Sequence, residues 1–201
     1  MPSARDDVLA RVRAALRDVP ADEPPEPALY EPPAPPPGDP VARFAERVAD
    51  YRATVREADD LAATIVRVCE EQGAHRLGVP VGLPWRPDGV ELVEDRGLGA
   101  RDLDALDGAL TGCALAIAET GTIVLDGGER SGRRALTLVP DLHLCVVERA
   151  QVVATVPEAV RALQGARGPF TFVSGPSATS DIELDRVEGV HGPRRLEVLI
   201  A

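Results

Sequence analysis

The stretch Leu110–Leu125, LTGCALAIAETGTIVL, decides the fold class of this chain. Its apolar residues run without polar alternation from Ala114 to Ala118, and again from Thr122 to Leu125. Continuous apolar runs are typical of strands that are buried on both faces of a sheet. The stretch therefore predicts either a long central strand or a hairpin inside the molecule.

Further apolar segments flank this stretch, and they alternate between strand and helix patterns. The periodicity predicts helices at 41–51, 61–72, 103–106 and 157–164, and strands at 53–57, 76–79, 90–93, 142–147, 169–173 and 196–200. Asp59 or Asp60 caps the second of these helices, and Gly73 ends it. This alternation predicts an α/β sheet that is covered by helices.

The N-terminal part of the chain has a different composition. Ser3 and Asp6 predict the start of an amphipathic helix that ends near Asp18. Residues 19–40 are rich in proline, which predicts an extended, semi-rigid linker. We therefore divide the chain into an N-terminal helix (1–18), a proline-rich linker (19–40) and an α/β domain (41–201).

Composition excludes several classes of function. The 201 residues carry a formal charge of −11, which disfavours nucleic acid and anionic membranes as partners. All 22 basic residues are arginine, so a Schiff-base lysine, a pyridoxal-phosphate anchor and a P-loop lysine are absent. A bound anion must therefore rest on arginine or on backbone N–H groups.

Cysteine usage and segment lengths point to a soluble, cytoplasmic protein. Cys69, Cys113 and Cys145 are widely separated and form no C-x-x-C pair, whereas an iron–sulfur cluster normally needs four thiolates. We predict no metal site and no cofactor in this chain, and no G-x-G-x-x-G follows a strand. The N-terminus lacks a secretory apolar segment, and no apolar run is long enough for a membrane span.

The first polar interruption of the apolar pattern is Glu119-Thr120-Gly121-Thr122. A charged group between two buried segments needs partners, because an unpaired buried charge costs several kcal/mol. One interpretation is a ligand-facing turn in which Glu119 is a nucleophile or base. The other is a glycine bend in which Glu119 pairs with an arginine.

The second interruption runs from Ser174 to Glu183, SGPSATSDIE, after a predicted strand. Ser180 and Glu183 have the spacing of a capping box, which predicts a helix running towards Gly189. The loop offers hydroxyl and N–H groups that suit a carboxylate or phosphate, and we expect it at the carboxyl ends of the strands. If Ser180 and Glu183 only cap a helix, they need no ligand.

The segment Gly189-Val190-His191-Gly192-Pro193 precedes the last strand. His191 between glycines is a candidate general base or hydrogen-bond donor, and it can equally orient a turn. Nearby arginines can reach an anion, although solvation at the surface is the default for each: Arg130, Arg133, Arg134, Arg194 and Arg195.

These segments together carry a family resemblance. AIAETGT at 116–122, LVPDLH at 138–143, SGPSATSDIE at 174–183 and GVHGP at 189–193 occur in the order seen in the lactate-utilisation protein C (LutC/YkgG) family, which contains the LUD domain. The resemblance covers about residues 41–201. It implies a three-layer α/β/α sandwich of the NagB/RpiA/CoA-transferase-like fold.

The resemblance also implies a function: an accessory role in oxidising L-lactate to pyruvate, together with iron–sulfur partner proteins. The chain would bind a small carboxylate or phosphate, and homo-oligomerisation stays open. Two alternatives remain: a stand-alone enzyme acting on a CoA thioester, sugar phosphate or folate-like substrate, and a non-catalytic ligand sensor. The candidate catalytic residues are Glu119 and His191, and the candidate ligand-binding residues are Thr120, Gly121, Thr122, Ser174, Gly175, Pro176, Ser177, Thr179, Asp181, Glu183 and Gly192.

Overall fold

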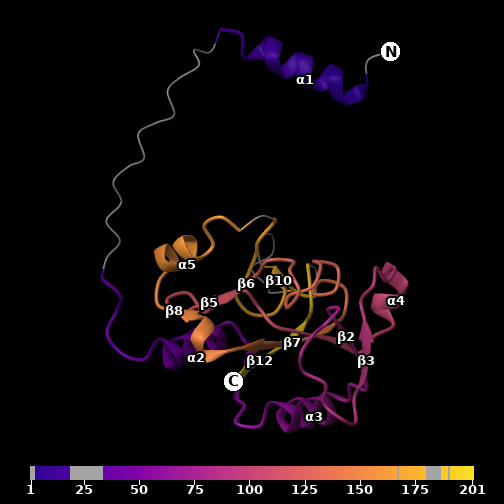
Figure 1. The fold of residues 1–201 in the computed structure, drawn as a ribbon, viewed down its shortest axis with the longest axis vertical. Helices are drawn as coiled ribbons and strands as arrows, with labels where there is room; N and C mark the ends of the chain where they lie inside the picture. The colour runs from indigo at the N-terminus through magenta and orange to yellow at the C-terminus, as the bar shows by residue number, and fades with distance from the viewer. Residues whose placement is uncertain (1–2, 19–33, 167, 180–186, 190) are drawn as a thin grey trace. The chain divides into compact units, whose positions relative to one another are not determined.

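A computed structural model describes residues 3–18, 34–166, 168–179, 187–189 and 191–201, and Figure 1 shows its ribbon. The chain divides into two compact units, residues 1–34 and 35–201. The helices are α1 (Ala4–Ala15), α2 (Pro40–Asp50), α3 (Leu61–Gln72), α4 (Ala100–Asp104), the 3-10 turn η1 (Arg149–Gln151) and α5 (Val156–Ala162). The strands are β1 (Thr54–Glu57), β2 (Arg76–Val79), β3 (Glu91–Glu94), β4 (Gly108–Thr111), β5 (Leu115–Ile117), β6 (Thr122–Leu125), β7 (Leu142–Val147), β8 (Val152–Val153), β9 (Thr171–Val173), β10 (Ala178–Thr179), β11 (Val187–Glu188) and β12 (Arg195–Ile200).

The first unit contains the predicted N-terminal helix, α1. Ser3 caps it, and the Ser3 hydroxyl and the Asp6 carboxylate exchange the two hydrogen bonds of a capping box. No residue of α1 is buried, and Val8, Val12 and Leu16 are all exposed. Local capping therefore stabilises this helix in place of a packed face.

A parallel sheet of six strands, ordered β1-β12-β7-β4-β2-β3, forms the centre of the second unit. Strand β7 lies in the middle and is buried along its whole length, as its apolar sequence predicts. Strand β12 runs beside β7 in parallel register, with Val198 opposite Cys145. The C-terminal segment is therefore part of the core.

Helices cover both faces of this sheet, and the predicted three-layer α/β/α class is confirmed (Figure 1). Ile65 and Val68 of α3 pack with Leu144 and Leu199 on one face. Phe44 of α2 packs on the other face in a cluster that also contains side chains of β12, β7, β5 and β6. The alternation of side chains along each strand divides its residues between the two cores.

The stretch Leu110–Leu125 forms parts of two sheets. Strand β4 belongs to the parallel sheet, whereas β5 and β6 form an antiparallel hairpin in a second sheet ordered β8-β5-β6-β9. Of the two predicted alternatives, the hairpin is confirmed and the long central strand is wrong. The chain changes sheet at Gly112, where a Cβ atom would lie 3.1 Å from the Trp85 ring. A bulky residue would obstruct this crossing.

The predicted helix from Ser180 towards Gly189 is wrong at its C-terminal end. Val187 and Glu188 form strand β11, which pairs antiparallel with Ala178 and Thr179 of β10. The backbone groups of these residues are thus used in a ladder instead of a helix. Ser180 and Glu183 lie outside the described residues.

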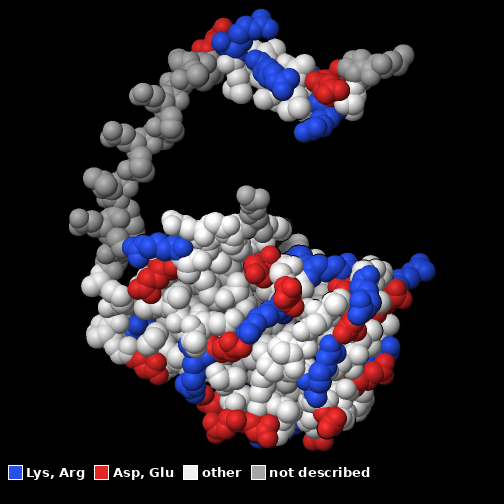
Figure 2. All heavy atoms as spheres, in the orientation of Figure 1, with Lys and Arg blue, Asp and Glu red and all other residues white. Residues whose placement is uncertain are grey.

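Charged side chains of both signs are interspersed on the face that Figure 2 presents. Several form surface ion pairs, such as Arg76 with Glu91 and Arg86 with Glu94. None of the helices in the described part of the chain has the length and apolar character that crossing a bilayer requires.

Candidate functional site

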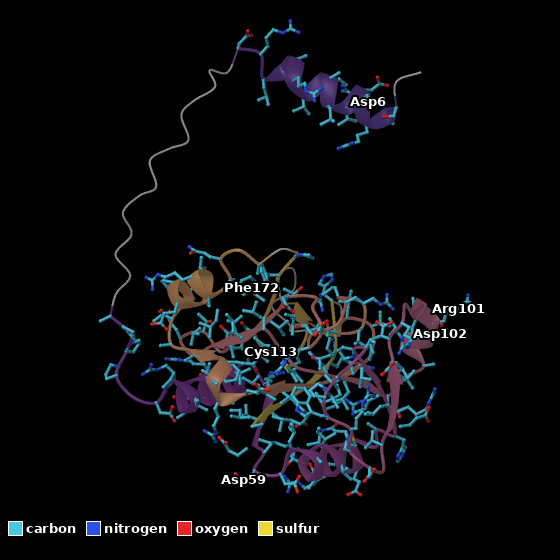
Figure 3. The ribbon with its side chains drawn as sticks, viewed as in Figure 1. Asp6, Asp59, Arg101, Asp102, Cys113 and Phe172 are labelled. Atoms are coloured by element: carbon cyan, nitrogen blue, oxygen red, sulfur yellow. The ribbon has the colours of Figure 1, made fainter. Side chains whose placement is uncertain are left out.

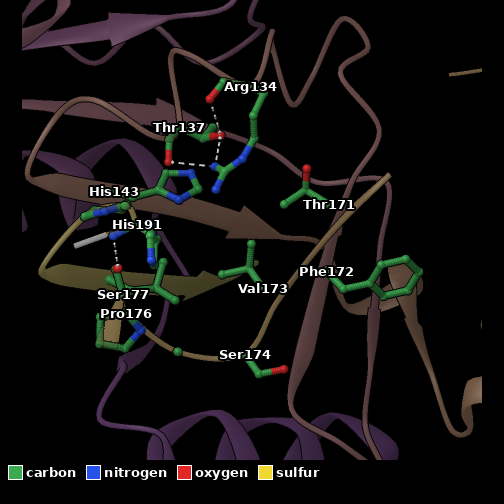
Figure 4. Close-up of a pocket in the computed structure, with 14 residues that line it drawn as sticks. Arg134, Thr137, His143, Thr171, Phe172, Val173, Ser174, Pro176, Ser177 and His191 are labelled. Atoms are coloured by element: carbon green, nitrogen blue, oxygen red, sulfur yellow. Dashed lines mark hydrogen bonds between the residues drawn. The ribbon is translucent and has the colours of Figure 1, made fainter. Parts of the chain in front are cut away.

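A cavity of about 230 Å³ lies beside strand β9 in the second unit. Its wall is formed by residues 171–177, residues 191–193, the pair Arg134 and Thr137, and the two buried residues His143 and Leu196. Figure 4 shows Arg134 extending towards the His143 ring, while Phe172 points away from the cavity. The cavity therefore combines a cation, an imidazole and a polar loop.

The cavity adjoins the amino ends of two central strands. His143 is the second residue of β7, and Leu196 is the second residue of β12. The expectation that the Ser174 loop sits at the carboxyl ends of the strands holds for β9, which it follows, but is wrong for the parallel sheet. The reason is that β9 belongs to the smaller, mixed sheet and pairs antiparallel with β6.

His143 is a polar residue inside the core, with 2% of its surface exposed. Its Nε2 atom lies 2.8 Å from the Thr111 hydroxyl oxygen on the adjacent strand β4. Burial lowers the pKa of His143 to about 4, and the nearby Arg134 charge contributes. The ring is therefore neutral near pH 7, and its Nδ1 atom has no hydrogen-bond partner among the described residues.

Arg134 supplies the positive charge of the cavity. Its Nη1 group donates to the carbonyl and the hydroxyl oxygen of Thr137, both at 3.1 Å. Within the described residues its Nε and Nη2 groups have no acceptor. Partial burial lowers the pKa of Arg134, although the side chain remains partly open to solvent. A guanidinium with two unused donors suits a carboxylate.

Two loops that border the cavity are held together through Ser177. Its hydroxyl oxygen accepts from the backbone N–H of His191 at 2.9 Å, and its own N–H donates to the Pro193 carbonyl at 2.8 Å. Gly192 and Pro176 complete this part of the wall. The structure thus brings candidate residues of the second interruption together with His191, whose side chain is exposed at the rim.

The two polar interruptions meet through a chain of hydroxyl groups. Thr120 Oγ1 lies 2.7 Å from Thr122 Oγ1, which lies 2.7 Å from Ser174 Oγ. Thr122 and Ser174 adjoin because they extend the antiparallel pairing of Ile123 with Val173. Ser174 borders the cavity, whereas Thr120, Gly121 and Thr122 are not part of its lining.

Glu119 lies apart from the cavity lining and is exposed. Its carboxylate accepts from the backbone N–H of Val156, at 3.3 Å, in the first turn of α5. Neither sequence interpretation anticipated this contact, since Glu119 pairs with no arginine among the described residues. The positive end of the helix dipole at the N-terminus of α5 stabilises a carboxylate at this position.

Of the arginines named from the sequence, Arg134 alone lines the cavity within the described residues. The others contact carboxylates: Arg130 pairs with Glu148, Arg133 with Asp95, and Arg194 and Arg195 with Asp141. Each of these arginines therefore has a carboxylate partner, and Arg194 and Arg195 share one.

His143, Thr111 and Thr137 are not among the functional residues predicted from the sequence. A histidine at the second position of an otherwise apolar strand was the available signal for His143. Among the predicted residues, Asp181 and Glu183 lie outside the described residues, and only the backbone pairing of Thr179 in β10 is described.

The cysteines are buried and separate from the cavity lining. Burial raises the pKa of Cys69 to about 11, and its hydrogen bond with Cys145 and burial raise the pKa of Cys113. Figure 3 places Cys113 in the interior of the domain. Within the described ranges, no three His, Cys, Asp or Glu side chains are grouped so as to hold a metal ion.

Comparisons with known proteins agree with this architecture. The chain is 48% identical over 166 residues to a "Lactate utilization protein C" of Deinococcus radiodurans, covering 79% of this chain and 77% of that protein. It is 29% identical to the "Uncharacterized protein YkgG" of Escherichia coli K12, covering 81% and 78%. A crystal structure of a DUF162 family protein from Deinococcus radiodurans matches with a TM-score of 0.70 and 38% identity, over 82% of this chain and 99% of that one.

The model of the LUD domain matches residues 41–201, which include every strand and the whole cavity described above. This chain therefore belongs to the LUD-domain family.

Proposed function

We propose that this chain serves L-lactate utilisation as an accessory component that binds a small anionic ligand in the Arg134–His143 cavity. Iron–sulfur partner proteins would carry the electrons that are released when lactate becomes pyruvate. The relative from Deinococcus radiodurans is named a lactate utilization protein, which supports a role in that process. The cavity supports the binding role, because two donor groups of Arg134 have no acceptor among the residues that the structure describes.

The division of labour between this chain and its partners rests on the donor groups present here. Thiolates are the ligands of iron–sulfur clusters, and the thiols of Cys69 and Cys113 have raised pKa values inside apolar cores. Cys69 belongs to the cluster on the α3 face, whereas Cys113 and Cys145 belong to the one on the α2 face. Three thiols divided in this way favour clusters that are held by partner proteins.

The alternative of a stand-alone enzyme receives less support from the geometry. Its nucleophile would be Glu119, and this carboxylate lies outside the cavity lining, at the N-terminus of α5. His191 does reach the rim, where it can contact a ligand without a carboxylate partner of its own among the described residues.

Deletion of the gene in a host without another lactate dehydrogenase tests the proposal. We expect growth on L-lactate to cease, and the unaltered chain to restore it. Arg134→Gln should fail to restore growth, whereas Arg101→Gln, an exposed arginine on α4, should succeed (Figure 3). Affinity purification from lactate-grown cells should recover iron–sulfur proteins. Unchanged growth of the deletion strain on lactate would refute the proposal.

A further inference from the structure

We infer that His143 determines which anion the cavity accepts, namely a short carboxylate with an oxygen atom on the neighbouring carbon, a 2-oxo or 2-hydroxy acid. This inference rests on the proposed function, because it assigns the ligand class of the same cavity. It concerns a residue that the sequence did not single out.

The charge of the cavity favours a single carboxylate. Arg134 is the one arginine of its lining in the described chain, and its Nε and Nη2 groups have no acceptor there. A guanidinium fork matches one carboxylate in a bidentate arrangement. The neighbouring Arg133 pairs with Asp95, whose side chain is 2% exposed. Arg133 therefore contributes little of the second positive charge that a phosphate dianion would need.

The neutral ring of His143 supplies a second, uncharged contact. Its Nε2 atom is held by Thr111, while Nδ1 has no partner among the described residues. No buried side-chain nitrogen or oxygen atom of the described residues lacks a partner, so Nδ1 is accessible from the cavity, where a ligand oxygen can take the place of water. Arg134 extends towards this ring in Figure 4, so a carboxylate on Arg134 brings its neighbouring carbon towards His143.

The Thr111 hydroxyl allows the ring to meet either oxidation state of the ligand. A hydroxyl group can donate to Nε2 or accept from it. When Thr111 donates, Nδ1 carries the proton and can donate to a 2-oxo oxygen. When Thr111 accepts, Nδ1 is bare and can accept from a 2-hydroxyl group. Thr111 is thus a positioning residue that lets one site hold both forms.

The size of the cavity favours a short acid. Its volume of about 230 Å³ is below the range typical of drug-sized ligands, which is roughly 300–1,000 Å³. A CoA thioester or a folate would leave most of its surface outside.

Calorimetric titration of the purified full chain tests the inference with four probes: pyruvate, L-lactate, propionate and inorganic phosphate. Propionate is the matched control, because it lacks only the oxygen on the second carbon. We expect pyruvate and L-lactate to compete for one site and to bind at least about tenfold more tightly than propionate and phosphate. Equal affinity for pyruvate and propionate, or tighter binding of phosphate, overturns the inference.

Variants separate the two contacts. His143→Leu should bring the affinity for pyruvate down to that for propionate, which itself should change by less than about twofold. Arg134→Gln should weaken pyruvate and propionate alike, and Arg101→Gln should leave both unchanged. If His143→Leu does not fold, the wild-type panel still decides, and Thr111→Val should alter the ratio of pyruvate to L-lactate affinity. An unchanged ratio in Thr111→Val contradicts the role of Thr111.

The outcome is distinguishable from failure of the proposed function. If no acid binds but growth on lactate still depends on the gene, the ligand assignment is wrong and the accessory role stands. If the acids bind as expected but the deletion strain grows normally on lactate, the role in lactate utilisation is wrong and the specificity of His143 stands.

Discussion

The Nε2 atom of His143 and the hydroxyl oxygen of Thr111 lie 2.8 Å apart, on adjacent parallel strands inside the core. Both residues are almost fully buried, so this contact satisfies two polar groups where no solvent reaches. The other nitrogen of the ring is left for whatever enters the cavity. A core hydrogen bond thereby orients a side chain of the candidate site.

Burial of His143 predicts a pH dependence of stability. Its pKa is about 4 in the folded chain, against an ordinary value of 6.5. As the pH falls below 6.5, His143 becomes protonated in the unfolded chain but stays neutral in the folded chain. The free energy of unfolding therefore decreases between pH 6.5 and about 4. Urea unfolding should show that His143→Gln removes about 2 kcal/mol of the stability lost between about pH 7 and about pH 5. His75→Gln, at an exposed position, should retain that loss.

Gly175 is predicted to tolerate no side chain. It has φ +84°, and a Cβ atom would lie 2.5 Å from Tyr51 Cβ and 2.6 Å from the Tyr51 carbonyl oxygen, at the end of α2. Gly175→Ala should lower the free energy of unfolding by about 2–4 kcal/mol through strain and overpacking. Gly73→Ala is the control, with φ +64° and no atom within 4 Å, and should cost about 1 kcal/mol. Similar losses in urea titrations of the two variants would contradict the packing argument.

The buried carboxylate of Glu197 should be worth far more than a surface carboxylate. Its side chain is 3% exposed and accepts from Arg56 at 2.9 Å and from Gln72 at 2.8 Å. Glu197→Ala removes one of the two carboxylates of Arg56, which keeps Glu71, and also removes the acceptor of Gln72, so it should cost about 1.5–3 kcal/mol. Glu91→Ala, which breaks a pair whose carboxylate is 60% exposed, should cost less than about 1 kcal/mol. Chemical denaturation of both variants measures the two losses of unfolding free energy. Equal losses would contradict the prediction.

The hydroxyl chain from Thr120 to Ser174 should be cooperative. Thr122 sits in its middle, so Thr122→Val removes two hydrogen bonds and should cost about 1–3 kcal/mol. Thr120→Val removes only the terminal bond and should cost about 0.5–1.5 kcal/mol. A double-mutant cycle of Thr122→Val with Ser174→Ala should give less than the sum of the single losses. Strict additivity would mean that the two hydroxyl groups do not interact.

Packing against α2 is one reason why each of the two polar interruptions contains a glycine. A Cβ atom on Gly121 would lie 2.6 Å from backbone atoms of Arg47 and Val48 in α2, and Gly175 meets Tyr51 at the end of the same helix. From the sequence, both glycines are candidate ligand-binding positions. Close approach to α2 explains the requirement for glycine at both, and Gly175 also borders the cavity.

The sequence by itself determined the fold class and most of its elements. Apolar periodicity predicted α3 and β7 because helix and strand place side chains on a buried face with different, locally readable periods. The capping of α3 by Asp60 and its end at Gly73 were likewise local, since they depend on neighbouring backbone groups. The lack of lysine meant that a bound anion rests on arginine or backbone N–H groups.

Only the tertiary structure decided which residues form the cavity. Five arginines looked alike in the sequence, and Arg134 differs because the carboxylates that engage the others come from distant parts of the chain. His143 and Thr111 are 32 positions apart and meet only because β4 and β7 pair in one register. Glu119 is exposed although apolar residues precede it, because it lies in the turn between β5 and β6. Contacts between distant segments depend on how strands pair and pack, which local periodicity does not encode.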